Sequence, residues 1–153
     1  MTRTIYLALF NNGPKPAHYA IWIPKLNPDI LGKLIQVDGN PATGFHLQFV
    51  RNYNIASDTL SEYKLTPLAE VDDKYVADPA GTERSIDTTA RDRLESVATV
   101  VKPPGRSAKP FDSEAPNCQN WLYKYVQKLI KEGFVESSAG LVVQDAPKVF
   151  EKA

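Results

Sequence analysis

The sequence has few of the residues that hold proteins together covalently or through a metal. Its 153 residues include a single cysteine, Cys118, and two histidines. One cysteine cannot form an intramolecular disulfide, which excludes a secreted disulfide scaffold. One cysteine and two well-separated histidines also make no recognisable zinc spacing, so we expect neither a metal nor another cofactor. The chain must fold by burying a hydrophobic core, which this length permits.

Long apolar runs and an excess of one charge are also missing. The apolar run over residues 5–10 is too short for a signal peptide, and nothing approaches the ~20 apolar residues that a membrane helix needs. Lysine and arginine together number 18, as do aspartate and glutamate, so charge gives no case for binding nucleic acid. Asn-x-Ser/Thr sequons do not occur. We therefore expect a cytoplasmic protein that does not span a membrane.

The first half of the chain has the pattern of a β-sheet. Apolar, aromatic and β-branched residues predict strands over 4–10, 18–23, 34–38 and 45–50, and an extended segment over 63–71 interrupted at Pro67. The turn signals between these segments favour an antiparallel meander. Because side chains alternate across a strand, His18, Ala20 and Trp22 should share one face of the second strand.

The second half has a helical pattern. Apolar spacing predicts a helix from Ile86 to Val101, capped by Asp87 or Thr88. The clearest helix is predicted by an apolar stripe of Cys118, Trp121, Leu122, Tyr125, Val126, Leu129 and Ile130. Beyond it, residues 141–143 are expected to form a short strand. We expect one α+β domain over residues 1–146, with an antiparallel sheet packed against the cysteine-bearing helix, and a C-terminal tail over 147–153.

The position of Cys118 suggests nucleophilic chemistry. The first turn of a helix has unpaired N–H groups and the positive end of the helix dipole, and both favour the thiolate. Asp112 or Ser113 is expected to cap this helix. A thiol nucleophile needs a base, and His18 opens a predicted strand on which the small Ala20 would let a helix approach closely. On the following strand, Gln36 is placed to orient the imidazole.

These motifs, in this order, carry a resemblance. His18-Tyr-Ala-Ile-Trp22, then a polar residue on the next strand, then Asn117-Cys-Gln-Asn-Trp121 at a helix start resemble the circularly permuted papain-like proteins, which include the lecithin:retinol acyltransferase type and NlpC-type thiol enzymes. In these proteins the histidine strand precedes the cysteine helix. The chain is also similar to small uncharacterised fungal proteins with a Gly-Asn-Pro-like turn, here residues 39–41. The resemblance covers roughly residues 5–134 and implies a permuted papain-like fold.

The resemblance assigns a role to each matching residue. It implies that Cys118 is the nucleophile, His18 the base and Gln36 the third polar residue of a cysteine-dependent hydrolase or acyl/peptidyl transferase. Gln119 and Asn120 differ from the Glu-His pair of the acyltransferase branch, so we do not expect that specific activity. The substrate would be a small molecule or peptide with an amide, ester or thioester. The alternative is a non-catalytic binding module on the same scaffold. Further candidates for the substrate cleft are Trp22, Asp38, His46 and Asn117.

Overall fold

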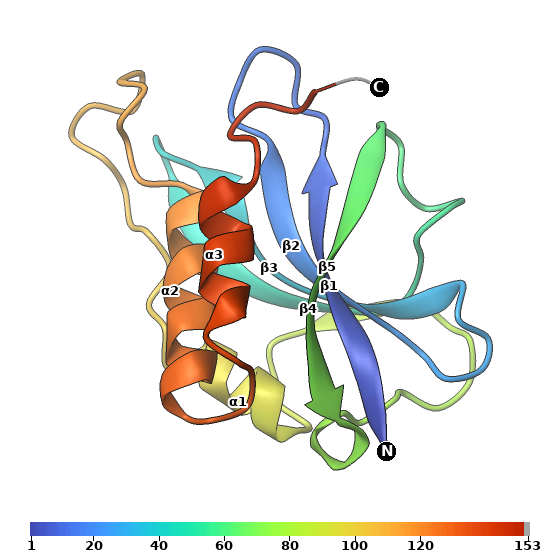
Figure 1. The fold of residues 1–153 in the computed structure, drawn as a ribbon. Coiled ribbons are helices and arrows are strands. Elements are labelled where there is room, and N and C mark those ends of the chain that lie inside the picture. Colours follow the sequence, from blue (N-terminus) through green and yellow to red (C-terminus); the bar gives the residue numbers. More distant parts are fainter. Residues whose placement is uncertain (152–153) are drawn as a thin grey trace.

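An antiparallel sheet of six strands forms the centre of the computed structural model, which describes residues 1–151 (Figure 1). The strands are β1 (Thr2–Phe10), β2 (His18–Pro24), β3 (Leu31–Asn40), β4 (Gly44–Asn54), β5 (Tyr63–Asp72) and β6 (Ser85–Asp87). Their order across the sheet is β5-β1-β2-β3-β4-β6. Pro67 lies on the edge strand β5, where the pairing with β1 shifts register, as expected for a residue without a backbone N–H.

Three helices lie together on one side of this sheet (Figure 1). They are α1 (Arg93–Thr99), α2 (Cys118–Lys131) and α3 (Ser138–Asp145), and a short 3₁₀ turn, η1 (Asp73–Tyr75), follows β5. The structure confirms the predicted α+β class and the antiparallel sheet. Within residues 1–151, no helix combines the length and the apolarity needed to cross a bilayer.

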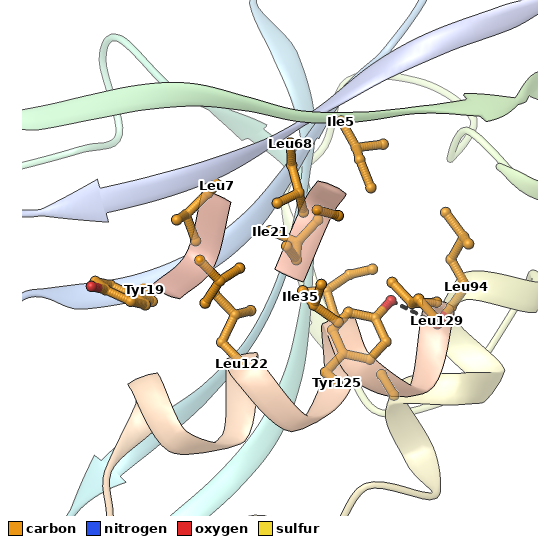
Figure 2. Close-up of a cluster of buried hydrophobic side chains, with 14 of the residues drawn as sticks. Ile5, Leu7, Tyr19, Ile21, Ile35, Leu68, Leu94, Leu122, Tyr125 and Leu129 are labelled. Carbon is orange, nitrogen blue, oxygen red and sulfur yellow. Dashed lines mark hydrogen bonds between the residues drawn. The ribbon is translucent and has the colours of Figure 1, made fainter. Parts of the chain in front are cut away.

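The main core lies between α2 and the sheet. Leu122, Tyr125 and Leu129 of α2 point toward Ile21 and Ile35 of the sheet (Figure 2). Tyr125 also donates a hydrogen bond from its hydroxyl to the Leu94 carbonyl oxygen, 2.8 Å away, which ties α2 to α1. The apolar stripe read from the sequence is therefore the surface that buries α2.

A second, smaller cluster covers the other face of the sheet and corrects one expectation. Ala20 and Trp22 belong to this cluster, together with Ile55 from the segment after β4. The helices instead pack on the face that carries Tyr19 and Ile21. Alternation predicted the two faces of β2 correctly, but the idea that Ala20 makes room for the helix is wrong.

Two further predictions about the second half are wrong. Helix α1 begins at Arg93 with Asp92 as its cap, and not near Asp87. Ile86 pairs with Val50 as part of β6, so its apolar side chain does not belong to a helix. The segment expected to be a strand over residues 141–143 lies within the helix α3.

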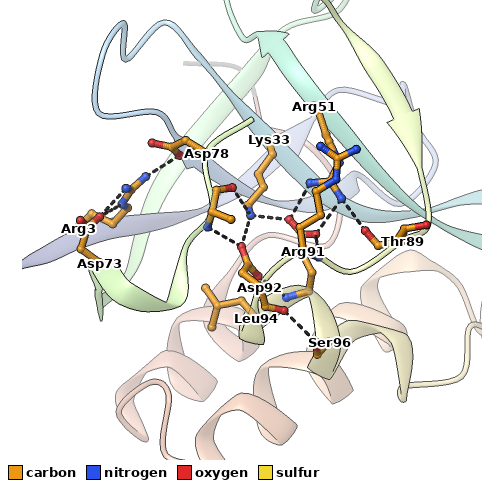
Figure 3. Close-up of polar contacts among 12 residues, drawn as sticks. Arg3, Lys33, Arg51, Asp73, Asp78, Thr89, Arg91, Asp92, Leu94 and Ser96 are labelled. Atoms are coloured by element: carbon orange, nitrogen blue, oxygen red, sulfur yellow. Dashed lines mark hydrogen bonds and ion pairs between the residues drawn. The ribbon is translucent and has the colours of Figure 1, made fainter. Parts of the chain in front are cut away.

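Buried charges fasten α1 to the sheet (Figure 3). Glu95 of α1 accepts hydrogen bonds from Arg51 of β4 at 2.8 and 2.9 Å and pairs with Lys33 of β3. Lys33 also pairs with Asp92, and Arg51 with Asp87. Arg51 and Glu95 are both 0% exposed. Such charges are tolerated in a core because each is paired and hydrogen-bonded.

The expected C-terminal tail contacts the domain over its first residues. The Ala17 N–H donates to the Lys148 carbonyl oxygen at 2.8 Å, and Phe150 is part of the main core. The Tyr19 hydroxyl donates to the Pro147 carbonyl oxygen at 2.7 Å. The last two positions of the expected tail, 152–153, lie outside the described residues.

Candidate active site

The local sequence places Cys118 as the first residue of α2. Asn117 adopts an extended conformation, and its side chain accepts from the Gln119 N–H at 2.9 Å. The Asn120 side chain reciprocates by accepting from the Asn117 N–H at 2.8 Å, which completes a capping box. The cap is therefore Asn117, and the expectation of Asp112 or Ser113 is wrong. The predicted first-turn position of Cys118 is confirmed.

The cap has a chemical consequence for the first turn of α2. Asn117 accepts hydrogen bonds from the N–H groups of Gln119, Asn120 and Trp121. The Cys118 N–H is the amide of this turn that Asn117 does not bind. This N–H lies next to the sulfur in the first turn of the helix.

The sulfur of Cys118 lies beside the start of β2. Its Sγ is 3.8 Å from the carbonyl oxygen of Ala17, the residue before the strand. The Gln119 side chain donates to the same oxygen at 3.0 Å and to the Lys148 carbonyl oxygen at 2.7 Å. These contacts hold the start of α2 against the start of β2, the strand that His18 opens.

The His18 ring is held on its far side by Gln36. His18 Nε2 is 2.8 Å from Gln36 Oε1. That oxygen can only accept, so this contact is a hydrogen bond when Nε2 carries the proton. The ring also packs against Phe10, with 5.6 Å between the ring centroids. The predicted neighbourhood of His18 and Gln36 is present in the structure.

Cys118 and His18 are coupled electrostatically. Burial lowers the pKa of His18, but interactions with Cys118, followed by Gln36 and Asp38, together outweigh burial and leave the pKa raised. Burial raises the pKa of Tyr19 to about 12, and the Cys118 charge adds to this. An imidazole that gains a proton more readily beside a thiol is the arrangement that a thiolate–imidazolium pair requires.

A pocket of about 600 Å³ opens onto this pair. One wall is the β3–β4 hairpin, including Asp38, and the other is the segment over residues 110–118, including Asn117. Phe111, which is 98% exposed, stands at the rim. Cys118 itself is only 7% exposed, so the pocket is the route by which a substrate would reach it. Two predicted cleft residues, Asp38 and Asn117, therefore line the pocket.

Two other predicted cleft residues lie elsewhere. Trp22 is buried in the second core cluster, edge-on to Tyr53. His46 is an exposed residue of β4 and does not line the pocket. Sequence reasoning also missed Gln48, which accepts from Gln36 Nε2 at 3.1 Å. Its signal was weak: a polar residue on the polar face of a half-buried strand.

The described residues show no metal centre near this pair. In the chain from residue 1 to residue 151, no group of three or more His, Cys, Asp or Glu side chains could hold a metal ion. The pocket-lining residues that can hydrogen-bond or ionise include Lys15, Asp38, Asn117 and Ser113.

Fold and site together define an α+β protein with a cysteine at a helix start, a histidine at a strand start and a glutamine behind the imidazole. The chain belongs to a family of unknown function, DUF6540, whose model matches residues 5–136. The match spans both Cys118 and His18. A search of curated proteins finds no match, and neither does a search of solved structures.

Proposed function

We propose that the protein is a cysteine-dependent hydrolase or acyl/peptidyl transferase with a circularly permuted papain-like fold. The observation that carries the proposal is the His18 ring, which has Gln36 on Nε2, interacts electrostatically with Cys118 and lines the same pocket as Cys118. The order of the elements, with the histidine strand before the cysteine helix, supports the permuted arrangement. Nucleophile, base and orienting group together form the usual set for covalent catalysis.

The chemistry uses these residues in two steps. The Cys118 thiolate adds to a carbonyl carbon, and the Cys118 N–H donates to the oxygen that becomes negative. Imidazolium His18 gives its proton to the departing amine, alcohol or thiol as the bond to the carbonyl breaks, which leaves an acyl thioester on Cys118. A water molecule or an acceptor nucleophile then transfers its proton to His18 and attacks the thioester, which releases the thiolate.

A labelling experiment tests this proposal. Cys118 is the only cysteine, so iodoacetamide modification reports on this residue alone. At pH 6.5 we expect the folded chain to react ~10-fold faster than the same chain in denaturant, because a thiolate–imidazolium pair is the reactive form. His18→Ala should remove the advantage. His46→Ala, at the exposed histidine outside the pocket, is the matched control and should keep it.

The rival function is a binding module that uses the same pocket without catalysis. It is favoured by one observation: the sulfur has an acceptor in the Ala17 carbonyl at 3.8 Å, the contact that a protonated, unreactive thiol would make. If Cys118 in the folded chain labels no faster than in denaturant, the result supports the binding module. Fast labelling, followed by mass mapping of adducts from small acyl and amide electrophiles, would support the enzyme and narrow the leaving group.

A further inference from the structure

A second amide stands behind the one that orients His18. Gln36 on β3 and Gln48 on β4 are directly opposite in the strand register. The Gln36 Nε2 donates to the Gln48 Oε1 at 3.1 Å, while the Gln36 Oε1 faces His18 at 2.8 Å. The two glutamines and the imidazole therefore form one continuous chain of hydrogen bonds that ends at the His18 ring.

The direction of the Gln36 amide decides what His18 can do. With the oxygen toward Nε2, that nitrogen keeps the proton, and Nδ1 of the neutral ring has the lone pair that can take a proton from the thiol. With the NH₂ group toward Nε2, the neutral ring would carry its proton on Nδ1. His18 could then not act as a base toward Cys118 from that nitrogen. An amide has no intrinsic preference between these orientations, so something must select one.

We infer that Gln48 is a positioning residue that fixes the proton of His18 on Nε2 by holding the Gln36 amide in one direction. The Gln48 oxygen accepts from the NH₂ end of Gln36 and so turns the other end, the oxygen, toward the ring. The sheet fixes which two side chains meet, because Phe45, Leu47 and Phe49 of β4 alternate toward the main core and set the register that puts Gln48 opposite Gln36. The catalytic part of the inference rests on the proposed function.

The tautomer can be measured without any enzymatic turnover. In a Cys118→Ala, His46→Gln chain, His18 is the only histidine, and ring ¹⁵N NMR reports its protonation directly. We expect the neutral ring to carry its proton on Nε2. Gln48→Glu, which can only accept, should keep this tautomer. Gln48→Lys, which can only donate, should bind Gln36 Oε1 and move the population toward Nδ1–H. The same tautomer in all three folded chains would overturn the inference.

Thiol reactivity provides the second readout. In the chain that keeps Cys118, Gln48→Met removes the acceptor at similar length and without charge, so it remains informative even where Gln48→Lys does not fold. We expect iodoacetamide labelling at pH 6.5 to slow by ~3–10-fold in Gln48→Met. Without Gln48 to hold it, the Gln36 amide should form a weaker hydrogen bond to the charged His18 imidazolium. The midpoint of its pH–rate profile should move upward.

Gln48→Glu keeps an acceptor oxygen, so it is the rescuing variant and should label faster than Gln48→Met. Equal rates and equal pH profiles for wild type and Gln48→Met, with normal folding, would overturn the inference. If Cys118 of the folded wild-type chain labels no faster than in denaturant, the proposed function is overturned instead. The NMR experiment would still report whether Gln48 sets the His18 tautomer. The failures of the two proposals are thus distinguishable.

Discussion

At the scale of single residues, Asn117 joins the stability of α2 to the reactivity of Cys118. Its side chain caps the helix, and its neighbour is the sulfur-bearing residue. Substitution by aspartate keeps a capping oxygen and adds a negative charge at the positive end of the helix dipole, which favours the folded helix. The same charge disfavours a thiolate close by. The two properties should therefore move in opposite directions.

We accordingly predict that Asn117→Asp leaves the free energy of unfolding within ~0.5 kcal/mol of wild type or raises it. Labelling of its Cys118 at pH 6.5 should slow by ~3–10-fold because the new carboxylate lies beside the thiolate. Asn117→Ala, which loses the cap, should instead lower the stability by about 1 kcal/mol. Urea denaturation and iodoacetamide kinetics measure both effects. Labelling of Asn117→Asp at the wild-type rate would contradict the assignment of a thiolate.

Residue-level prediction succeeded where a local signal existed. Cys118 at a helix start and His18 at a strand start each follow from nearby apolar patterns. The partnership of Gln36 and Gln48 depends on the register between two strands, and no local pattern states that register. Trp22 was misplaced because alternation assigns residues to faces of a strand but does not say which face the helices cover.

At the scale of elements, the short helix α1 depends on the charges buried beneath it. Lys33 and Arg51 come from neighbouring strands, and Glu95 of α1 pairs with both. Replacing one member of a buried pair leaves the other charges uncompensated, which is usually strongly destabilising. The same change on the surface has little effect, since exposed pairs are solvated.

The matched pair of variants is Glu95→Gln and Glu132→Gln. Glu132 pairs with Lys128 on the exposed side of α2 at 3.2 Å. We predict that Glu95→Gln lowers the free energy of unfolding by about 3 kcal/mol. Glu132→Gln should change it by no more than ~0.5 kcal/mol. Denaturant titration followed by far-UV circular dichroism measures both. Equal effects would mean that the buried charges add no specific stability.

The same network predicts how stability depends on pH. Burial raises the pKa of Glu95, but hydrogen bonds from Arg51 and the charge of Lys33 outweigh it, so the pKa is lowered from its ordinary value of 4.5. Arg51 is the main cause of the lowered pKa of Asp87. A carboxylate with a lowered folded-state pKa contributes stability above its unfolded value and loses it as the pH falls through the folded value.

Unfolding free energy should therefore be level with respect to these two groups above pH 4.5 and should fall as the pH drops further. In Glu95→Gln the decline should be shallower, because one of the titrating carboxylates is gone. Urea titrations at a series of pH values from neutral to acidic measure the slope. A steeper or unchanged decline in the variant would count against Glu95 as a source of the acid sensitivity.

The wrong predictions at this scale have physical causes. Ile86 fits the helical spacing of α1, but it pairs with Val50 on the sheet edge, a contact 36 positions away in sequence that local periodicity cannot reveal. Residues 141–143 are rich in valine, which favours strands, yet they form part of α3. Ala139 and Val143 of α3 are buried in the main core, so the helix is held by its packing. Packing of this kind overrides intrinsic propensity.

At the scale of the whole molecule, Lys148 contacts both segments that carry the candidate site. The Lys148 carbonyl oxygen receives hydrogen bonds from the Ala17 N–H and from the Gln119 side chain. These two donors belong to the segments that carry His18 and Cys118. The segment that was expected to be a tail therefore links the segment that carries His18 to the segment that carries Cys118. The sequence could not predict this contact, because it is made by a main-chain carbonyl group that every residue type has.

Comparing Phe150→Ala with deletion of residues 147–153 separates the effect of the Lys148 hydrogen bonds from that of the buried Phe150 ring. We predict that Phe150→Ala, which keeps the main-chain contacts, lowers the stability by about 3 kcal/mol through the lost ring and leaves labelling of the folded chain near wild type. The deletion should destabilise the chain further, and Cys118 in its remaining folded population should lose its enhanced reactivity, because Ala17 and Gln119 lose their shared acceptor. Urea denaturation and iodoacetamide kinetics under fully native conditions separate the two effects. Wild-type labelling in the deleted chain would show that the start of α2 meets β2 without help from residues 147–150.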